Sequence, residues 1–269
     1  DNGAVAQWNG SGWASRASVS SSNLNGVSGS GTGSVWFVGD SGTIMKWSFG
    51  GGPLPYSSGS LTGITSSWGS DANNIWFVGY SGQILYWNGT RLQAQPSGTT
   101  QSLLEVWGTD ARNVWAMGSA GTLLHWDGST WSPVSSGTTQ LLDGAFGTSA
   151  NNVWFVGSSG TILRWDGTAV SPVASPVTSS LTSIWGPSAN DLWATSYTGI
   201  LLHWDGTSWT QQASGITADL KRVFGTSSSN IWVVGQGGQI LRWNGTSWTA
   251  QTSGTTQNLY TVWASSPSS

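Results

Sequence analysis

Few residues in this sequence have side chains that could act as acids, bases or metal ligands. Among 269 residues there is one glutamate, Glu105, there are two histidines, and there is no cysteine. Three aspartates recur at one position of successive repeats, too far apart to act together as acid and base: Asp127, Asp166 and Asp205. The histidines and carboxylates show no metal-ligand spacing. The sequence therefore predicts a protein that is not an enzyme and has neither a metal site nor a cofactor.

The two histidines occupy a repeated position that accepts very different side chains. His125 and His203 each precede a tryptophan, and in other repeats the same position holds Gln7, Lys46, Tyr86, Arg164 and Arg242. Such variety predicts a solvated edge of the repeat rather than a general base or a metal ligand. Apart from Arg164 and Arg242, the arginines fall at dissimilar repeat positions, so they do not form the arginine cluster that a sialidase-like site needs.

Polar residues in the loops of the repeat are better candidates for binding. One loop position varies between fixed neighbours, as either a ligand-facing or an unconstrained surface position would: Asp40, Tyr80, Ser119, Ser158, Tyr197 and Gln236. A second loop repeats Ser-Gly-Thr-Thr-Gln, whose hydroxyls and amides can bind sugar hydroxyls or form turns. Its glutamines are Gln101, Gln140 and Gln257.

One series of tryptophans completes the predicted sugar-binding site. Each of these tryptophans follows an aliphatic residue in a short apolar segment: Trp36, Trp76, Trp115, Trp154, Trp193 and Trp232. Core packing is the commoner role for such residues. We expect that some also expose a ring edge between repeats, on which the apolar face of a sugar can stack.

The spacing of the tryptophans shows which elements must position these residues. Successive copies of the motif are separated by 40 residues and then four times by 39. In the third full copy we expect strands at 103–107, 114–117 and 122–126 and a fourth from Trp131, joined by Gly, Asn-Gly or Asp-Gly turns. Four short antiparallel strands in about 40 residues form one blade of a β-propeller.

The phase of the repeat predicts how many blades the ring has. We label the four strands of a unit A to D in chain order. The chain contains seven copies of strands A, C and D, but six of strand B. We therefore expect one all-β domain over residues 1–269, a seven-bladed β-propeller. Its composite blade combines 4–8 and a strand from Trp13 with 259–263. A six-bladed ring with a frayed extra unit is the alternative.

The composite blade leaves one strand position to be filled. Strand B of this blade could come from the tail containing Pro267, from further residues, or from a second molecule. The last option predicts a homodimer through the composite blade.

Composition excludes several classes of partner. The chain has eight Lys and Arg residues, too few to neutralise a nucleic acid backbone. It has no apolar run near the roughly 18 residues needed for membrane insertion. A weakly charged surface rich in Ser, Thr, Gly and Asn favours an extracellular or cell-surface protein.

The repeated motifs also resemble a known family. Leu-x-x-Val-Trp-Gly, Asn-Val-Trp-x-Val-Gly and Gly-Thr-Ile-Leu-x-Trp-Asp-Gly-Thr-Ser-Trp resemble the Trp-rich propeller repeats of the tectonin group. They are also similar to Trp-rich repeats of bacterial surface proteins. The resemblance implies a lectin that binds glycans in pockets repeated around the ring. The period of 39 residues is longer than is typical of that group, and seven units exceed the six blades of its better-known members.

These observations favour a multivalent carbohydrate-binding protein whose partners are glycans or glycoconjugates. The alternative is a non-catalytic structural or protein-interaction propeller of a surface protein. A third reading is a glycoside hydrolase of the Asp-box type, because Asp127-Gly-Ser-Thr-Trp131 is similar to that motif but one residue too short. A two-residue turn explains the same residues.

Overall fold

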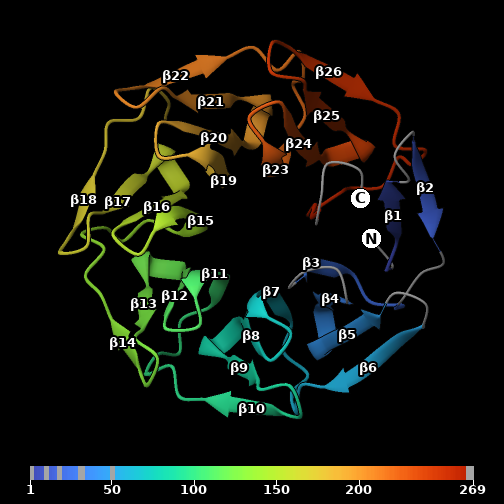
Figure 1. The fold of residues 1–269 in the computed structure, drawn as a ribbon, viewed down its shortest axis with the longest axis vertical. Helices are drawn as coiled ribbons and strands as arrows, with labels where there is room; N and C mark the ends of the chain where they lie inside the picture. Colours follow the sequence, from blue (N-terminus) through green and yellow to red (C-terminus); the bar gives the residue numbers. More distant parts are fainter. Residues whose placement is uncertain (1–2, 9–11, 17–19, 30–33, 49–51, 265–269) are drawn as a thin grey trace.

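The structure is a computed structural model that describes residues 3–8, 12–16, 20–29, 34–48 and 52–264. Six four-stranded antiparallel sheets stand around a central channel, each formed by consecutive strands, as Figure 1 shows. The fold is therefore an all-β propeller of four-stranded blades, as the repeat predicts. A two-stranded sheet, β1 (Val5–Trp8) with β2 (Trp13–Arg16), lies between the last blade and the first.

The strands of each blade run outward from the channel in sequence order. Blade 1 contains β3 (Leu24–Gly29), β4 (Ser34–Gly39), β5 (Thr43–Ser48) and β6 (Pro53–Ser57). Blade 2 contains β7 (Ile64–Asp71), β8 (Asn74–Gly79), β9 (Ile84–Trp87) and β10 (Leu92–Gln95). Blade 3 contains β11 (Leu103–Asp110), β12 (Asn113–Gly118), β13 (Leu123–Trp126) and β14 (Trp131–Pro133).

The other three blades repeat this arrangement. Blade 4 contains β15 (Leu142–Ser149), β16 (Asn152–Gly157), β17 (Ile162–Trp165) and β18 (Val170–Pro172). Blade 5 contains β19 (Leu181–Ser188), β20 (Asp191–Ser196), β21 (Leu201–Trp204) and β22 (Trp209–Gln212). Blade 6 contains β23 (Leu220–Ser227), β24 (Asn230–Gly235), β25 (Ile240–Trp243) and β26 (Trp248–Gln251).

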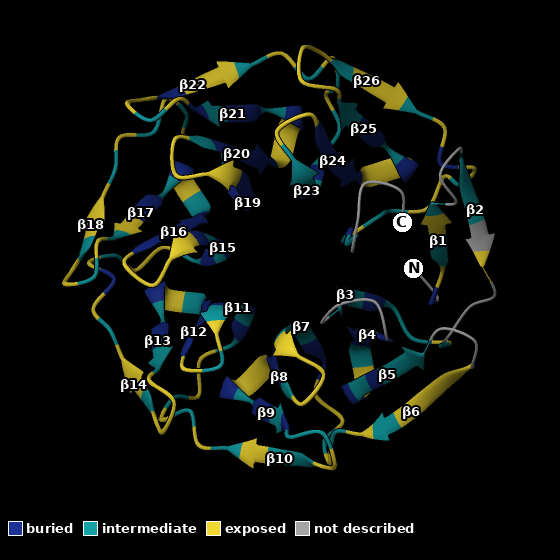
Figure 2. Ribbon diagram, in the orientation of Figure 1, coloured by how far each residue is buried: buried dark blue, intermediate teal, exposed yellow. Residues whose placement is uncertain are grey.

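Burial decreases from the middle of each blade to its outer edge. All six residues of β12, β16 and β24 are buried, because a strand between two neighbouring blades is covered on both faces. The outermost strands expose much of their length, as Figure 2 shows. This explains why Asn-Val-Trp-Phe-Val-Gly reads as an almost continuous apolar run.

A tight turn follows the second strand of every blade. These turns are η1 (Asp40–Gly42), η2 (Tyr80–Gly82), η3 (Ser119–Gly121), η4 (Ser158–Gly160), η5 (Tyr197–Gly199) and η6 (Gln236–Gly238). In η3, Ala120 and Gly121 both have positive φ, 55° and 69°. A Cβ on Gly121 would lie 2.0 Å from the carbonyl oxygen of Thr138, so only glycine fits where this turn meets the next interblade loop.

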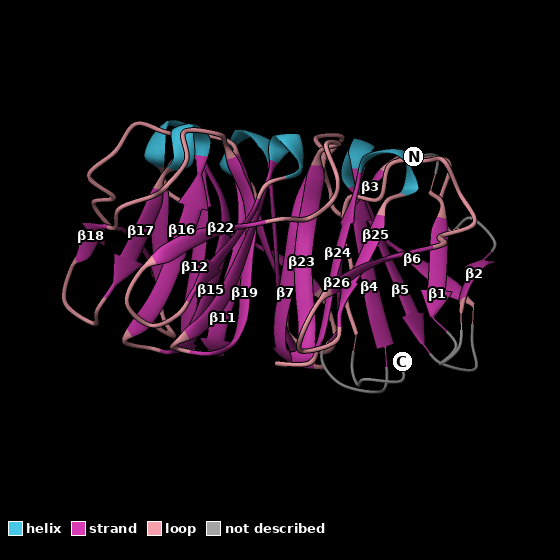
Figure 3. Ribbon diagram, turned by 90° about the horizontal axis from the view of Figure 1, so that it is seen from above, coloured by secondary structure: helices cyan, strands magenta, loops and turns pink. Residues whose placement is uncertain are grey.

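The η turns and the loops between blades lie on the same face of the ring. Figure 3 shows the turns along one side, and the backbone N–H of Ser158 donates to the carbonyl of Leu141 at 2.9 Å. We call this side the η face.

The predicted count of seven blades is wrong, and the six-bladed alternative is the one observed. Leu259–Trp263 is not a strand, because the position beside it that strand B fills in other blades holds no strand within the described residues. We call β1, β2 and Leu259–Trp263 the terminal sector. Pro267 lies outside the described residues. No helix among the described residues is long and apolar enough to cross a membrane.

Candidate functional site

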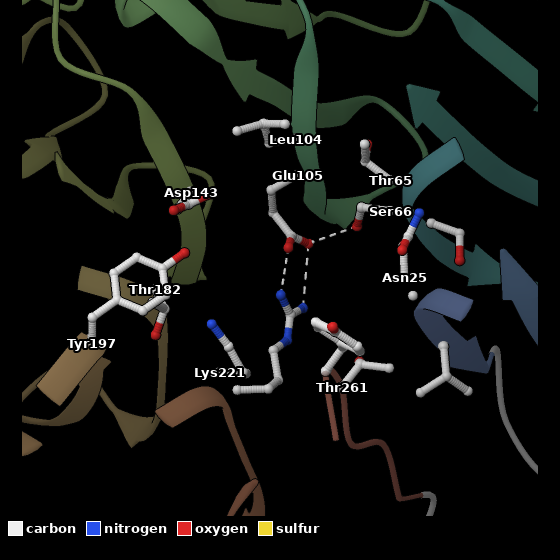
Figure 4. Close-up of a pocket in the computed structure, with 15 residues that line it drawn as sticks. Asn25, Thr65, Ser66, Leu104, Glu105, Asp143, Thr182, Tyr197, Lys221 and Thr261 are labelled. Carbon is white, nitrogen blue, oxygen red and sulfur yellow. Dashed lines mark hydrogen bonds and ion pairs between the residues drawn. The ribbon is translucent and has the colours of Figure 1, made fainter. Parts of the chain in front are cut away.

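A β-bulge shapes the inner strand of every blade. In β11, Leu103 pairs with Gly118 and Glu105 with Met117, so Leu104 is the extra residue between them. The same shift occurs in β3, β7, β15, β19 and β23. A bulge re-aims neighbouring side chains. The bulged residue and the residue after it, such as Leu104 and Glu105, recur from blade to blade and supply most of the lining of a polar cavity of about 170 Å³ in the channel, shown in Figure 4.

An ion pair crosses this channel from blade 3 to blade 6. Glu105 is 4% exposed, and both of its carboxylate oxygens accept from the guanidinium of Arg222, with Nη2 3.2 Å from Oε1. Ser66 Oγ donates to the same Oε1 at 3.0 Å. Burial alone would lower the pKa of Arg222, but the charge and hydrogen bonds of Glu105 raise it above its ordinary value. The guanidinium of Arg222 is therefore held in its charged form.

A second charged group lies beside this pair at the mouth of the channel. Burial and the negative charge of Glu105 raise the pKa of Asp143 to about 6, while Lys221 opposes the rise. Lys221 Nζ lies 4.3 Å from the ring centroid of Tyr197 and 3.2 Å from Asp219. Burial and the charges of Asp143 and Asp219 raise the pKa of Tyr197. Figure 4 shows Tyr197 pointing toward Asp143.

The exposed apolar side chains gather on the η face. Among the described residues, five large hydrophobic side chains are exposed, and four of them belong to η turns, to the loop before β7 or to the terminal sector: Leu61, Tyr80, Tyr197 and Tyr260. Tyr197 precedes Thr198, a β-branched residue held at a φ of 73°. Such a residue rarely adopts this conformation. The η face therefore carries most of the exposed large hydrophobic side chains of the described residues.

The predicted loop positions all occur at the start of the six η turns. Asp40, Tyr80, Ser119, Ser158, Tyr197 and Gln236 are each the first residue of a turn and are partly or fully exposed. Only Tyr197 of this set lines the channel cavity. Asp40 is engaged within its own blade, where its carboxylate accepts from the side-chain amides of Asn23 and Asn25 at 3.1 and 3.0 Å.

The predicted glutamines are exposed on the η face, but the hydroxyls of their loops are used internally. Gln101, Gln140 and Gln257 each donate their backbone N–H to a threonine Oγ1 two residues earlier. Ser136 Oγ donates to the carbonyl of Gly121 at 2.7 Å. These loops form turns, and of the three glutamine side chains that of Gln140 also accepts from Ser159 Oγ at 3.1 Å.

The six predicted stacking tryptophans are interior. Trp36, Trp76, Trp115, Trp154, Trp193 and Trp232 are between 0% and 4% exposed. Each packs on an aromatic ring of the following blade or, for Trp232, of the terminal sector: Trp87, Trp126, Trp165, Trp204, Trp243 and Trp8, in the same order. The expectation that some of these rings expose an edge is wrong, because each ring is covered by its own blade and by the ring that follows it around the propeller.

The variable position before the strand C tryptophan covers the same rings. Lys46, Arg164 and Arg242 place their charges 5.1 to 5.3 Å from the centroids of Trp36, Trp154 and Trp232. Tyr86, His125 and His203 stack on Trp76, Trp115 and Trp193 at 4.3 to 4.9 Å. The solvated-edge prediction missed this role, which flat and cationic groups share because both bind an aromatic face.

The aspartates of the Asp-Gly segments serve as turn formers. Asp127 Oδ1 accepts from the hydroxyl and backbone N–H of Ser129 and from the N–H of Thr130, and these bonds lower the pKa of Asp127 to about 2. Asp166 and Asp205 form the same turn. Within the described part of the chain, no three His, Cys, Asp or Glu side chains come together as metal ligands.

The charged groups in the channel were not predicted from the sequence. Glu105 and Arg222 are 117 residues apart, three repeat units of 39, so they hold the same position in their blades. This shared position of an acidic and a basic residue is the signal that the sequence carries for the pair.

Comparisons with known proteins show similarity in fold. No family model and no curated protein sequence matches the chain. A structure described as YCF48 bound to D1 peptide has a TM-score of 0.75 at 15% identity, over 99% of this chain and 90% of that one. YCF48 from Cyanidioschyzon merolae gives 0.70 at 16%, over 89% of both chains.

A third similar structure is the WD40 β-propeller domain of Doa1, with a TM-score of 0.72 at 14% identity over 86% of this chain and 81% of that one. These comparisons do not confirm the resemblance to tectonin-like lectins. At such identities they establish the fold alone, and by that measure the chain is a β-propeller.

Proposed function

We propose that this protein is a non-catalytic interaction propeller that binds a segment of a partner polypeptide at the mouth of its channel on the η face. The observation that carries the proposal is the site formed by Tyr197, Lys221 and Asp143 above the Glu105–Arg222 pair. It combines a rigid, partly exposed tyrosine ring with fixed charges of both signs. Tyrosine is among the residues that contribute most of the energy in protein interfaces, and the charged groups around it can select the partner's charge.

The lining of the channel suits a polypeptide segment, and the buried tryptophans count against a glycan. Threonine, serine, asparagine and charged side chains line the cavity, and Tyr260 adds a second ring that is 37% exposed. Backbone amides of an extended peptide find both donors and acceptors on such a surface. The six interior tryptophans, in contrast, offer no ring for a sugar to stack on.

The similar structures support the same proposal. One of them is described as YCF48 bound to a peptide. Neither the two YCF48 structures nor the Doa1 domain is described as an enzyme. An extracellular or cell-surface setting stays a prediction from composition.

A peptide library displayed on phage and selected on the immobilised full chain tests the proposal. We expect enriched peptides whose affinity falls at least tenfold with Tyr197→Ala or Lys221→Ala. Arg112→Ala is the matched control, because this exposed residue lies in the turn between β11 and β12, away from the η face. A glycan array run in parallel measures the alternative function. Glycan binding without peptide binding would refute the proposal.

A further inference from the structure

The cavity in the channel is lined by two rings of side chains, to which each blade contributes one residue at its bulge and one just after it. The bulged residues form the first ring, in blade order: Asn25, Thr65, Leu104, Asp143, Thr182 and Lys221. The second ring contains Glu105 and Arg222, which pair with each other across the channel. The acid and the base of the first ring, in contrast, form no ion pair with each other within the described residues.

Asp143 is the carboxylate of this lining that lacks a partner. In the part of the chain that the structure describes, its side chain takes part in no hydrogen bond and no ion pair. Lys221 is held elsewhere, because its Nζ lies 3.2 Å from Asp219 and 4.3 Å from the centroid of the Tyr197 ring. A half-buried carboxylate without a counter-charge is a costly arrangement, and a bound cation would relieve it.

The charges at the channel mouth leave an excess of negative charge. Three carboxylates face two cations there: Glu105, Asp143 and Asp219 against Lys221 and Arg222. The elements packed against β15 are β11, β12, β16, β19 and η3, and they add no other ionisable side chain except Asp110, at the far end of β11. With Asp143 ionised, the mouth therefore attracts a cation.

The size and the aromatic walls of the cavity suit one long side chain. Its volume of about 170 Å³ is below the roughly 300–1,000 Å³ of pockets that enclose a whole small molecule. Tyr197 and Tyr260, each 37% exposed, line it, and Figure 4 shows Tyr197 pointing toward Asp143. Aromatic rings attract cations and also cover the apolar stems of lysine and arginine.

We propose that the partner segment inserts a lysine or arginine side chain into this cavity, where its charge pairs with Asp143 and its stem packs on Tyr197. This inference rests on the proposed function, because it names the group by which the channel mouth recognises a polypeptide. Lys221 has a different part in the site. It is held by Asp219 and orders the Tyr197 ring, so it positions the wall of the cavity, whereas Asp143 selects the charge of the guest.

Binding of a cation is linked to the ionisation of Asp143. The pKa of this group is about 6, raised by burial and by the charge of Glu105 and opposed by Lys221. The cation pairs with the ionised form, so affinity is full above pH 7 and falls as the pH drops through 6. Because about one-tenth of the carboxylate stays ionised at pH 5, affinity there should be about tenfold lower than at pH 7.5.

Four pools of short capped peptides test the proposal on the immobilised full chain at physiological ionic strength. The central residue is lysine, arginine, citrulline or glutamate, and the other positions are random with lysine, arginine and histidine omitted. Citrulline is the neutral analogue of arginine. We expect the lysine and arginine pools to be retained at least tenfold more than the other two at pH 7.5. This preference should disappear at pH 5 and in Asp143→Asn.

Asp127→Asn is the matched control for non-specific attraction between charges. It removes an exposed carboxylate in the turn between β13 and β14, where asparagine stands in other blades, so it should leave the preference unchanged. A preference that persists at pH 5 or in Asp143→Asn overturns the inference, because the cation is then recognised elsewhere.

Tyr197→Ala separates this inference from the proposed function, since it should lower the retention of every pool. Equal retention of all four pools, lost in Tyr197→Ala, overturns the selection of a cation and leaves the interaction function standing. Retention of no pool at all overturns both.

Discussion

The contact between blades 3 and 4 and the contact between the terminal sector and blade 1 are built from equivalent positions, yet they differ in how well they are closed. In the first, Trp115 and Met117 of β12 cover Val153, Phe155 and Leu163 of blade 4, which are at most 3% exposed. In the second, Val5 is the residue of the terminal sector that packs in the apolar cluster of blade 1, where Leu24 and Phe37 are 9% and 7% exposed.

The difference shows that burial in this ring depends on the neighbour more than on the residue itself. Valine, phenylalanine and tryptophan occupy corresponding positions on both faces. Only the face that the second strand of the preceding blade covers is fully buried. The second strand of each blade therefore covers the next blade. Where no second strand is described, as in the terminal sector, the following blade is more exposed.

A large loss of stability should come from breaking the Glu105–Arg222 ion pair, which does not depend on the contact between the terminal sector and blade 1. Glu105→Ala leaves the guanidinium of Arg222 without its partner, but the Arg222 side chain is 28% exposed and can be hydrated, so we expect a cost of about 2–3 kcal/mol, below the roughly 3–5 kcal/mol of a fully buried pair. Because the pair joins blades 3 and 6 directly across the channel, we expect this loss in the free energy of unfolding measured in urea.

The double variant Glu105→Ala with Arg222→Met is the control. It removes both charges, so it should be more stable than Glu105→Ala alone. A cost below about 1 kcal/mol for Glu105→Ala would mean that the cross-channel pair contributes little and that the blade contacts alone hold the ring.

A matched pair of tryptophans tests the comparison directly. Trp165→Ala removes a ring that packs on Trp115 at 5.3 Å and donates to the carbonyl of Ala150, so we expect a loss of about 3 kcal/mol. Trp47→Ala removes the equivalent ring, which lacks the preceding tryptophan, and should cost about 1–2 kcal/mol. Thermal unfolding of both variants measures the difference, and equal losses would show that the two contacts are equally closed.

The smallest effect concerns Asp143, which lies in neither contact. Its pKa is about 6 in the folded chain and 3.8 in the unfolded one, so its contribution is fully present below pH 4 and is lost as the pH rises through 6. Asp143→Asn keeps the side chain neutral and should stabilise the protein by about 1–2 kcal/mol at pH 7 but not at pH 4.

Asp127→Asn provides the opposite case. The pKa of Asp127 is lowered to about 2, so its contribution is present above pH 4 and is lost as the pH falls through 2. The two variants should therefore shift the pH dependence of the melting temperature in opposite directions. A shift in the same direction would show that the charges around Asp143 do not disfavour its ionised form.

The strands and turns of this fold were predictable because the repeat states them six times. The expected strand at 103–107 is observed as Leu103–Asp110, and that at 114–117 as Asn113–Gly118. The number of blades was not predictable by counting units, since the terminal residues Leu259–Trp263 follow the pattern without finding a strand to pair with. Pairing depends on a neighbour in space, and the pattern of one strand does not contain that information.

The site was only partly predictable. The loop residues that the sequence singled out begin the η turns, and Tyr197 among them lines the channel cavity. The ring edge that some tryptophans were expected to expose is covered, because the next blade supplies an aromatic ring and the neighbouring strand of the same blade supplies a cation or a flat side chain. Asp143 and Lys221 carry no motif, and they matter because bulges in two different blades turn them toward the same cavity.

The open sector also has a consequence for how the chain reaches this fold. Contacts between successive blades join residues about one repeat apart, so they can form progressively as local units. The contacts of Trp8 and Trp13 with Trp232, in contrast, join parts of the chain more than 200 residues apart. Loop closure over such a distance is entropically costly and slow. Folding should therefore proceed blade by blade, with the seam at the terminal sector closing last and opening first.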